Sequence, residues 1–408
     1  MGYRCMVQLP LDLTGIAEWI IERGLQGLPI EEQLGGFSQR IYEAGFPMKR
    51  VGMGMRTLHP RYGAISYVWR PEVDRVEYSP RERTIYELQE YLQSPVHFMI
   101  ETGNRLLRQR LDTGEPLAFP ILEELRDEGM TEYAARLVHH YPSSRGNTAL
   151  EGIFFSCATD QPLGFDAEQL QQVADLLPYL AMAIKSRLTY DVANTVTQTY
   201  LGHDAGHRVL TGEIERGSIQ TIQAVIWFCD LRGFTQLADT LPRDQLIEIL
   251  DDYFDAMAGP VQANRGQILK FMGDGFLATF DLTAVQEEEV CRHALKAAAE
   301  LRTEFTRFNQ GRQATDKPVM DFGLSLHLGD VFYGNIGASN RLDFTVVGPA
   351  VNEASRIQAL CRPLGCNILI SSAFHEMAST SQGELVSLGA HRLRGVRAPQ
   401  ELFTLAID

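Results

Sequence analysis

The chain has 408 residues, enough for two or three domains with cores of their own. Its hydrophobic content of 45% and charged content of 22% are those of ordinary soluble globular proteins. The formal net charge of −15 argues against nucleic acid as a partner, because binding a phosphate backbone needs clustered Lys and Arg.

The cysteine and hydropathy patterns predict a cytoplasmic protein without a membrane span. The 6 cysteines are scattered, mostly in apolar runs, and none forms a Cys-x-x-Cys pair, so we expect reduced, buried thiols and neither a zinc site nor disulfides. The longest apolar run, residues 176–184, contains Pro178 and is too short to cross a bilayer. Residues 1–15 lack the charged start and long apolar middle of a secretory signal.

The N-terminal part begins with helices and then turns to strands. Residues 11–45 predict two amphipathic helices separated at Gly35-Gly36. Residues 50–58 and 62–69 alternate in hydropathy and predict a half-buried hairpin that turns at 59–61.

The stretch that follows is less regular. Its mixed, polar pattern predicts helices near 101–111 and 121–138 and a short strand near Ala118. A strand at 150–158 and a helix from Asp166 to Arg187 then close the region.

This order of elements over residues 1–187 resembles a GAF-type sensory domain, which would respond to an unidentified small molecule or other signal. No motif names a ligand. The adjacent His139 and His140 fit a solvated pair better than a haem or metal site, because neighbouring residues of a helix cannot both face one site. Cys157 lies in an apolar strand and fits the core better than a chromophore attachment point.

Residues 188–218 predict a connecting segment. Leu188, Val192 and Val196 repeat every four residues, and glycines at 202, 206, 212 and 217 then break the run. A short signalling helix leading to a hinge would have this pattern, and so would a passive linker.

A first acidic motif, WFCDLRGFT at 227–235, follows a strongly apolar run. Asp230 ends a predicted strand at 224–229, and Gly233 permits a tight turn before a helix that starts near Thr235. The unpaired N–H groups of a helix start can bind an anion, and a carboxylate beside them can hold a divalent ion that bridges the same phosphates.

A second acidic motif, KFMGDG at 270–275, predicts a hairpin of strands 268–271 and 276–280 with Asp274 at its tip. Either aspartate alone fits ordinary turn chemistry. Together the two carboxylates could meet at one site.

The rest of the C-terminal half alternates helices and strands, which predicts an α/β domain with helices packed on one side of a mixed sheet. The predicted helices are 244–257, 287–308 and one from about Pro349, and the predicted strands are 319–327, 331–336, 343–348, 367–370 and 402–406.

Residues 219–408 resemble the catalytic domain of the class III nucleotidyl cyclases, the adenylate and guanylate cyclase family. The resemblance rests on three motifs in the family's order, the two acidic ones and DFTVVGPAVNEASR at 343–356. It implies a ferredoxin-like core that converts ATP to 3′,5′-cyclic AMP and pyrophosphate. It also implies that Asp230, Asp274 and the carbonyl of Leu231 bind two Mg²⁺ or Mn²⁺ ions, which would supply positive charge in an acidic protein.

The resemblance assigns further roles around the substrate. The turn from Arg232 to Thr235, which contains Gly233 and Phe234, would hold the β- and γ-phosphates by backbone N–H groups. Asn352 would orient the ribose, and Arg356 would neutralise the charge that builds on the phosphorus.

The resemblance makes Lys270 and Thr345 the base-selecting pair. A Lys donor and a Thr hydroxyl acceptor match N1 and N6 of adenine, whereas the guanylate-making relatives carry an acid where Lys270 stands. Thr345 resembles a subgroup that includes bicarbonate-responsive enzymes, so bicarbonate is a candidate modulator. Arg394 stands where the family often has a phosphate-contacting Lys.

A site of this family is assembled by two subunits, and one chain with both halves of the site predicts a homodimer. The expected sets are Asp230, Asp274 and Lys270 from one copy and Thr345, Asn352 and Arg356 from the other. Such a site favours a transmitting role for residues 188–218. A guanylate cyclase and a non-catalytic, nucleotide-binding regulator remain the alternatives.

Overall fold

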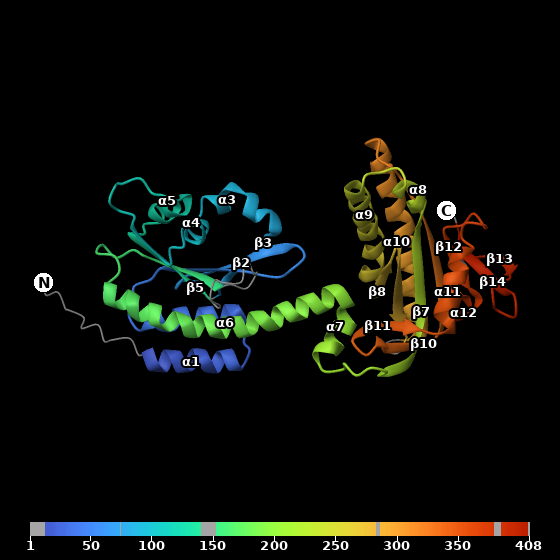
Figure 1. Ribbon diagram of the computed structural model, residues 1–408, viewed down its shortest axis with the longest axis horizontal. Coiled ribbons are helices and arrows are strands. Elements are labelled where there is room, and N and C mark those ends of the chain that lie inside the picture. Colours follow the sequence, from blue (N-terminus) through green and yellow to red (C-terminus); the bar gives the residue numbers. More distant parts are fainter. Residues whose placement is uncertain (1–12, 74, 140–151, 283–285, 379–384, 407–408) are drawn as a thin grey trace. The chain divides into compact units, whose positions relative to one another are not determined.

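The computed structural model describes residues 13–73, 75–139, 152–282, 286–378 and 385–406 (Figure 1). The chain divides into two compact units, Met1–Val196 and Thr197–Asp408. Each unit has a β-sheet and buried hydrophobic clusters of its own, so each is described by itself.

The N-terminal unit is built on a six-stranded antiparallel sheet in the order β3-β2-β1-β6-β5-β4. The hairpin predicted at its start is confirmed as the pair β1 and β2, in which Val51 lies opposite Trp69. The strands are β1 (Arg50–Arg56), β2 (Tyr62–Trp69), β3 (Glu77–Glu82), β4 (Leu106–Arg110), β5 (Glu132–His139) and β6 (Gly152–Thr159).

Helices cover both faces of this sheet. The apolar stripes of α1 (Leu13–Leu25), α2 (Ile30–Glu43) and α6 (Ala167–Leu201) bury one face, together with inward residues such as Met53 and Phe155. The other face carries a smaller cluster with α4 (Pro95–Thr102) and α5 (Pro120–Asp127). The remaining short helices are η1 (Arg83–Glu87) and α3 (Gln89–Leu92).

Several elements of this unit differ from the sequence prediction. Gly35 and Gly36 lie inside α2, and the break between the first two helices falls at residues 26–29, where Gly27 has a φ of +67°. The helices predicted near 101–111 and 121–138 are wrong in their second halves, which form the paired strands β4 and β5. No strand forms at Ala118. In these places pairing with a neighbouring strand outweighs local propensity.

The long helix α6 also differs from the prediction, since it does not stop at Arg187 but continues to Leu201. Leu188 and Val192 are buried along its course, which accounts for their spacing of four residues. The boundary between the two compact units therefore falls inside a helix. A second helix, α7 (His203–Leu210), follows after Gly202, whose φ is +88°.

The C-terminal unit is built on an eight-stranded mixed sheet in the order β13-β14-β12-β10-β7-β9-β8, with β11 paired to β10. Only the β10–β12 pair is parallel among the described pairs. The strands are β7 (Ile219–Arg232), β8 (Gln267–Met272), β9 (Gly275–Asp281), β10 (Asp321–Ala338), β11 (Arg341–Val347), β12 (Ile368–Ser371), β13 (Leu385–His391) and β14 (Gln400–Leu405).

The expectation of helices on one side of this sheet is wrong, because both faces are covered. The larger core packs α9 (Arg243–Ala263), α10 (Glu287–Ala314) and α12 (Ser372–Met377) against one face. On the other face, α7 and α11 (Pro349–Ala359) pack against a second cluster. The strands alternate accordingly: Val225 and Trp227 face the first cluster, and Ala224 and Ile226 face the second.

The two strands predicted at 319–327 and 331–336 are one strand, β10, paired along its length with β7. Strand β13 and helix α12 are missing from the prediction. The hairpin of β8 and β9, the strand β11 and the helix start at Pro349 are confirmed.

The tryptophans and cysteines are divided between the cores. Trp19 and Trp69 belong to the N-terminal unit, and Trp227 is fully buried in the C-terminal one. Cys157 is buried in β6, and burial raises the pKa of its thiol to about 12. Among the described residues, no helix is long and apolar enough to cross a membrane.

Candidate active site

Asp230 and Asp274 meet at one edge of the C-terminal sheet. Asp230 lies near the end of β7 and pairs across the sheet with Gly275 of β9, the residue that follows Asp274. The backbone N–H of Leu231 donates to the carbonyl of Asp274 at 3.0 Å. Two aspartates that lie far apart in the sequence are therefore held together by the ladder between β7 and β9.

The close approach of the two strands requires glycine at position 275. A Cβ on Gly275 would lie 2.4 Å from the carbonyl oxygen of Cys229 and 2.8 Å from the Cβ of Asp230. Both atoms belong to the same strand and cannot move independently. Any larger residue would therefore push the hairpin tip away from Asp230.

The two carboxylates repel each other. Burial first and the negative charge of Asp274 second raise the pKa of Asp230 to about 6, and the cation of Arg232 and a hydrogen bond from Gln358 oppose the shift. Asp230 would ionise more readily if a positive charge lay between the two carboxyl groups.

The pair fits part of a divalent-metal site rather than a closed one. Among the described residues, no group of three or more His, Cys, Asp or Glu side chains could hold a metal ion. Two carboxylates with one neighbouring carbonyl are hard oxygen donors, and such partial sets suit Mg²⁺, which takes its remaining ligands from phosphates and water.

The turn after Asp230 has the predicted conformation. Gly233 is exposed with a φ of +89° and leads into the short helix α8 (Phe234–Ala238). Phe234 is partly buried against the larger core, and Thr235 is exposed. The binding of phosphate by this turn stays a prediction.

Asn352 and Arg356 lie one turn apart on α11, and both line one hollow. Its lining also includes Gly348, Glu353 and Gly395, and neither aspartate contributes to it. A Cβ on Gly395 would lie 3.6 Å from the guanidinium nitrogens of Arg356.

Glu353 fixes α11 beside this hollow. It accepts a hydrogen bond from the side chain of Gln400 at 2.8 Å, and one of its carboxylate oxygens lies 3.7 Å from Nε2 of the buried His327. Burial lowers the pKa of His327 despite the nearby carboxylate. These contacts hold α11 against β10 and β14.

Lys270 and Thr345 lie on β8 and β11, two strands that approach each other within one unit. Their neighbours Leu269 and Phe344 pack in the same hydrophobic cluster. Thr345 is buried, and its hydroxyl has no hydrogen-bond partner among the described residues. A buried hydroxyl without a partner is costly, so this position is suited to a ligand contact.

Gln358 is a site residue that the sequence prediction missed. Its side-chain N–H donates to Oδ1 of Asp230, and it lies on the buried face of α11, one turn after Ala354. The signal for it was available, since a polar residue on an otherwise apolar helix face usually has a specific partner.

Arg232 was expected only as the first residue of the phosphate-holding turn, and the contacts of its side chain were not predicted. Its guanidinium donates to the carbonyl of Cys366 at 2.6 Å and lies 3.2 Å from a carboxylate oxygen of Asp321. These contacts tie the end of β7 to its neighbours and place a positive charge near Asp230.

Comparisons with known proteins find relatives of the C-terminal part of the chain. Residues 218–407 match the family model described as the adenylate and guanylate cyclase catalytic domain. An adenylate cyclase of Anabaena cylindrica is 35% identical over 164 residues, which are 39% of this chain and 32% of the relative. Adenylate cyclase 1 of Rhizobium meliloti (strain 1021) is 29% identical over 146 residues, 36% of this chain and 22% of the relative.

A crystal structure of the adenylyl cyclase CyaB from P. aeruginosa aligns with a TM-score of 0.42 and 26% identity, and covers 47% of this chain and 97% of that one. In the two adenylate cyclases named above, the matched region is a third or less of the relative's own length. The C-terminal unit carries a class III adenylate/guanylate cyclase catalytic domain.

Proposed function

We propose that the chain is an adenylate cyclase that converts ATP to 3′,5′-cyclic AMP and pyrophosphate at the interface of a homodimer. The observation that carries the proposal is the convergence of Asp230 and Asp274 at the edge where β7 and β9 meet. Two aspartates whose charges repel at a sheet edge suit two divalent ions, Mg²⁺ or Mn²⁺. When bound, such ions activate the attacking 3′-oxygen and neutralise the departing pyrophosphate.

The chain's own residues position the substrate around these carboxylates. The turn at Gly233, Phe234 and Thr235 holds the β- and γ-phosphates through backbone N–H groups, with Phe234 packed beneath. The carbonyl of Leu231 adds an oxygen beside the carboxylates.

A second copy supplies the remaining groups. Asn352 orients the ribose, and Arg356 places a guanidinium against the charge that develops on the phosphorus. The hollow that these two residues line supports this division, because neither Asp230 nor Asp274 of the same copy contributes to its walls. A homodimer then has two equivalent sites.

The adenine base is selected by Lys270 and Thr345. The unpartnered hydroxyl of Thr345 supports a direct contact with the base, where it accepts from N6 while Lys270 donates to N1. Because β8 and β11 approach each other, we assign Lys270 to the same copy as Thr345, in place of the division expected from the motifs. Bicarbonate is a candidate modulator at the Thr345 position.

We further propose that the N-terminal unit, GAF-like in its order of elements, regulates this activity. A small rotation between two copies would separate groups that must act together, so control through the dimer requires little movement. Residues 188–218 would transmit the change, and the location is proposed to be cytoplasmic. Arg394, exposed near the hollow of Arg356, is a candidate phosphate contact.

The direct test is a product assay on the purified chain with ATP or GTP and Mn²⁺. Cyclic AMP and pyrophosphate should form, with GTP much poorer, and Asp230→Asn should reduce turnover by at least about a hundredfold, the scale of losing a charge-stabilising group. Asp251→Asn, an exposed change on α9, is the matched control and should be unaffected.

Three outcomes would contradict the proposal in different ways. Preferred use of GTP would favour a guanylate cyclase and remove the role assigned to Lys270. Nucleotide binding without product would favour a non-catalytic regulator. Full turnover in Asp230→Asn would remove the metal assignment itself.

A further inference from the structure

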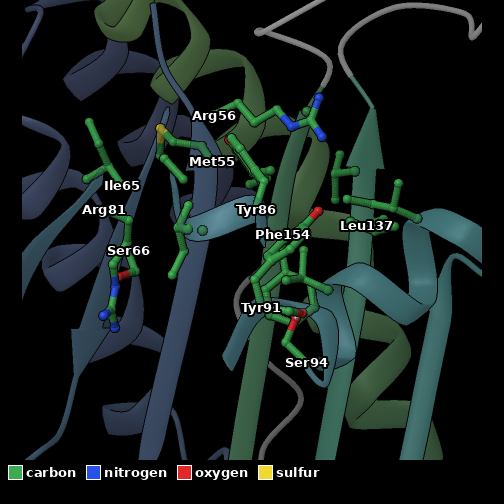
Figure 2. Close-up of a pocket in the computed structure, with 18 of the residues that line it drawn as sticks. Met55, Arg56, Ile65, Ser66, Arg81, Tyr86, Tyr91, Ser94, Leu137 and Phe154 are labelled. Carbon is green, nitrogen blue, oxygen red and sulfur yellow. Dashed lines mark hydrogen bonds between the residues drawn. The ribbon is translucent and has the colours of Figure 1, made fainter. Parts of the chain in front are cut away.

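A hollow in the N-terminal unit has no part in the proposed reaction. It has a volume of about 260 Å³ and lies between the sheet and the segment from η1 to α4 (Figure 2). The strands contribute Arg56, Ser66, Leu137 and Phe154 to its walls, and the helical segment contributes Tyr86 and Tyr91.

The strand pattern keeps this space open. On β1 and β2 the large residues Met53 and Tyr67 turn into the core under α1, α2 and α6. Three of the alternate positions that line the hollow are small, namely Gly54, Ala64 and Ser66. Protein interiors are otherwise close-packed, so a hollow of this size is suited to an occupant.

The walls favour a flat, apolar ring. Tyr86 and Tyr91 stand edge to face, with ring centroids 5.1 Å apart and an interplanar angle of 85°. Phe154, Ile85 and Leu137 complete an apolar lining. Aromatic side chains arranged in this way can pack against both the face and the edge of a planar ligand.

One end of the hollow is cationic. The guanidinium carbon of Arg56 lies 5.1 Å from the centroid of the Tyr86 ring, at the upper end of the view in Figure 2. The other arginine of the lining, Arg81, is paired with Glu90 at 3.3 Å. An arginine has five N–H donors, so Arg56 can keep its contacts with the protein and still bind a carboxylate.

Three hydroxyl groups of the lining donate to backbone carbonyls. The Ser66 hydroxyl donates to the carbonyl of Ser79 at 3.2 Å, and that of Ser94 to the carbonyl of Tyr91 at 2.5 Å. The Tyr86 hydroxyl donates to the carbonyl of Gly63 at 2.8 Å. Because Arg56 is a cation, it is the strongest donor for a negatively charged group on the occupant.

We propose that this hollow binds a small planar aromatic carboxylate, with its ring between Tyr86, Tyr91 and Phe154 and its carboxylate at Arg56. The volume lies just below the roughly 300–1,000 Å³ of typical ligand pockets, which excludes a tetrapyrrole or a dinucleotide. Binding in the N-terminal unit does not depend on the cyclase activity proposed above.

Calorimetric titration of the full-length chain with 1-naphthoate tests the site, and 1-naphthamide serves as an uncharged probe of the same shape. The parent should bind 1-naphthoate saturably at one site per chain and 1-naphthamide more weakly. Arg56→Gln should weaken naphthoate by about tenfold and leave naphthamide nearly unchanged, because only the charged contact is lost.

A filling variant and its matched control separate this hollow from general surface binding. Ser66→Leu places a large side chain in the hollow and should abolish binding of both probes. Ser186→Leu makes the same change at an exposed position of α6, which packs on the opposite face of the sheet, and should leave binding intact.

If Ser66→Leu does not fold, as judged by circular dichroism, Gly54→Val takes its place. A Cβ at Gly54 would meet the Phe154 Cβ at 3.9 Å, an ordinary van der Waals contact. The proposal is overturned if the parent shows no saturable binding, if Ser186→Leu loses as much binding as the filling variant, or if naphthoate and naphthamide bind equally well.

Discussion

At the scale of single residues, the ionised carboxylate of Asp230 destabilises the folded protein when no metal is bound. Its pKa of about 6 lies above the ordinary value of 3.8, so the folded state binds more protons than the unfolded state between these two values. Without metal, the carboxyl group therefore costs little stability below about pH 4, progressively more through pH 6, and its full amount above that.

Asp230→Asn should therefore stabilise the metal-free protein at pH 7.5 and have little effect at pH 4. We expect a gain of about 1 kcal/mol or less, since the partly exposed group is screened by solvent. Thermal unfolding in EDTA measures it, and Mn²⁺ should reverse the order by stabilising only the parent. A variant that is equally stable to the parent at both pH values would show that the repulsion is negligible.

Gln358 makes a second prediction at this scale. Its hydrogen bond to Asp230 fixes one carboxylate oxygen and leaves the other for a cation. Gln358→Leu should raise the Mn²⁺ concentration needed for half-maximal stabilisation by about tenfold or more, the scale of one lost hydrogen bond to a charged group. Gln313→Leu, at an exposed position of α10, is the control and should not change it.

The motifs predicted which residues converge at this edge, but not what surrounds them. Asp230 and Asp274 could be placed together because each ends or caps a strand whose apolar pattern is clear. Gln358 reaches the site from a helix far away in the sequence, and Arg232, although it is close to Asp230 on β7, contacts Cys366 and Asp321 from distant segments. Both sets of contacts depend on how α11 and β7 pack. The raised pKa of Asp230 depends on the same packing and has no counterpart in composition or spacing.

At the scale of elements, the buried carboxylate of Glu132 ties three segments of the N-terminal unit together. It accepts from Arg108 on β4 at 2.5 Å and from the backbone N–H of Phe165, just before α6, at 2.6 Å. Arg108 also donates to the carbonyl of Phe165 at 2.6 Å. The glutamate itself lies on β5 and is 2% exposed.

Arg108→Leu should leave Glu132 buried without its cation and destabilise the N-terminal unit by about 2–4 kcal/mol. Urea unfolding followed by circular dichroism measures the change. Arg61→Leu breaks the exposed pair with Glu82 and is the control, for which we expect little effect. Equal midpoints for the two variants would show that the buried pair is no more important than the exposed one.

Some elements of the fold could be predicted from the sequence and others could not. Long periodic segments such as α9, α10 and the hairpin of β8 and β9 follow directly from their apolar spacing. The short strands β4 and β13 carry exposed or mixed residues, and only pairing with β5 and β14 makes them strands. The length of β10 was hidden by Gly329 and Asp330, which resemble a turn but continue the ladder with β7.

At the scale of the whole molecule, the two sets of site residues predict complementation between inactive variants. Homodimers of Asp230→Asn or of Arg356→Ala should be inactive, but mixed dimers regain one complete site of two. An equal mixture should therefore recover about a quarter of the parent activity, since about half of the dimers are mixed. Cyclic AMP formation after mixing and equilibration measures it.

Mixing Lys270→Ala with each of the other two variants in the same assay shows to which half of the site Lys270 belongs. If Lys270 belongs with Thr345, Lys270→Ala should complement Asp230→Asn and fail to complement Arg356→Ala. The opposite pattern would return Lys270 to the copy that carries the aspartates. Mixing Asp230→Asn with Asp274→Asn should give nothing in either case.

The division of the tryptophans gives each half of the protein its own fluorescent reporter. Trp227 is fully buried, and its indole N–H has no hydrogen-bond partner among the described residues. Its fluorescence should therefore be emitted at short wavelength until the C-terminal core unfolds. A chain with both Trp19 and Trp69 replaced by phenylalanine would report that event alone. Comparing its melting curve with that of the Trp227→Phe chain would reveal whether the halves lose structure together or one after the other.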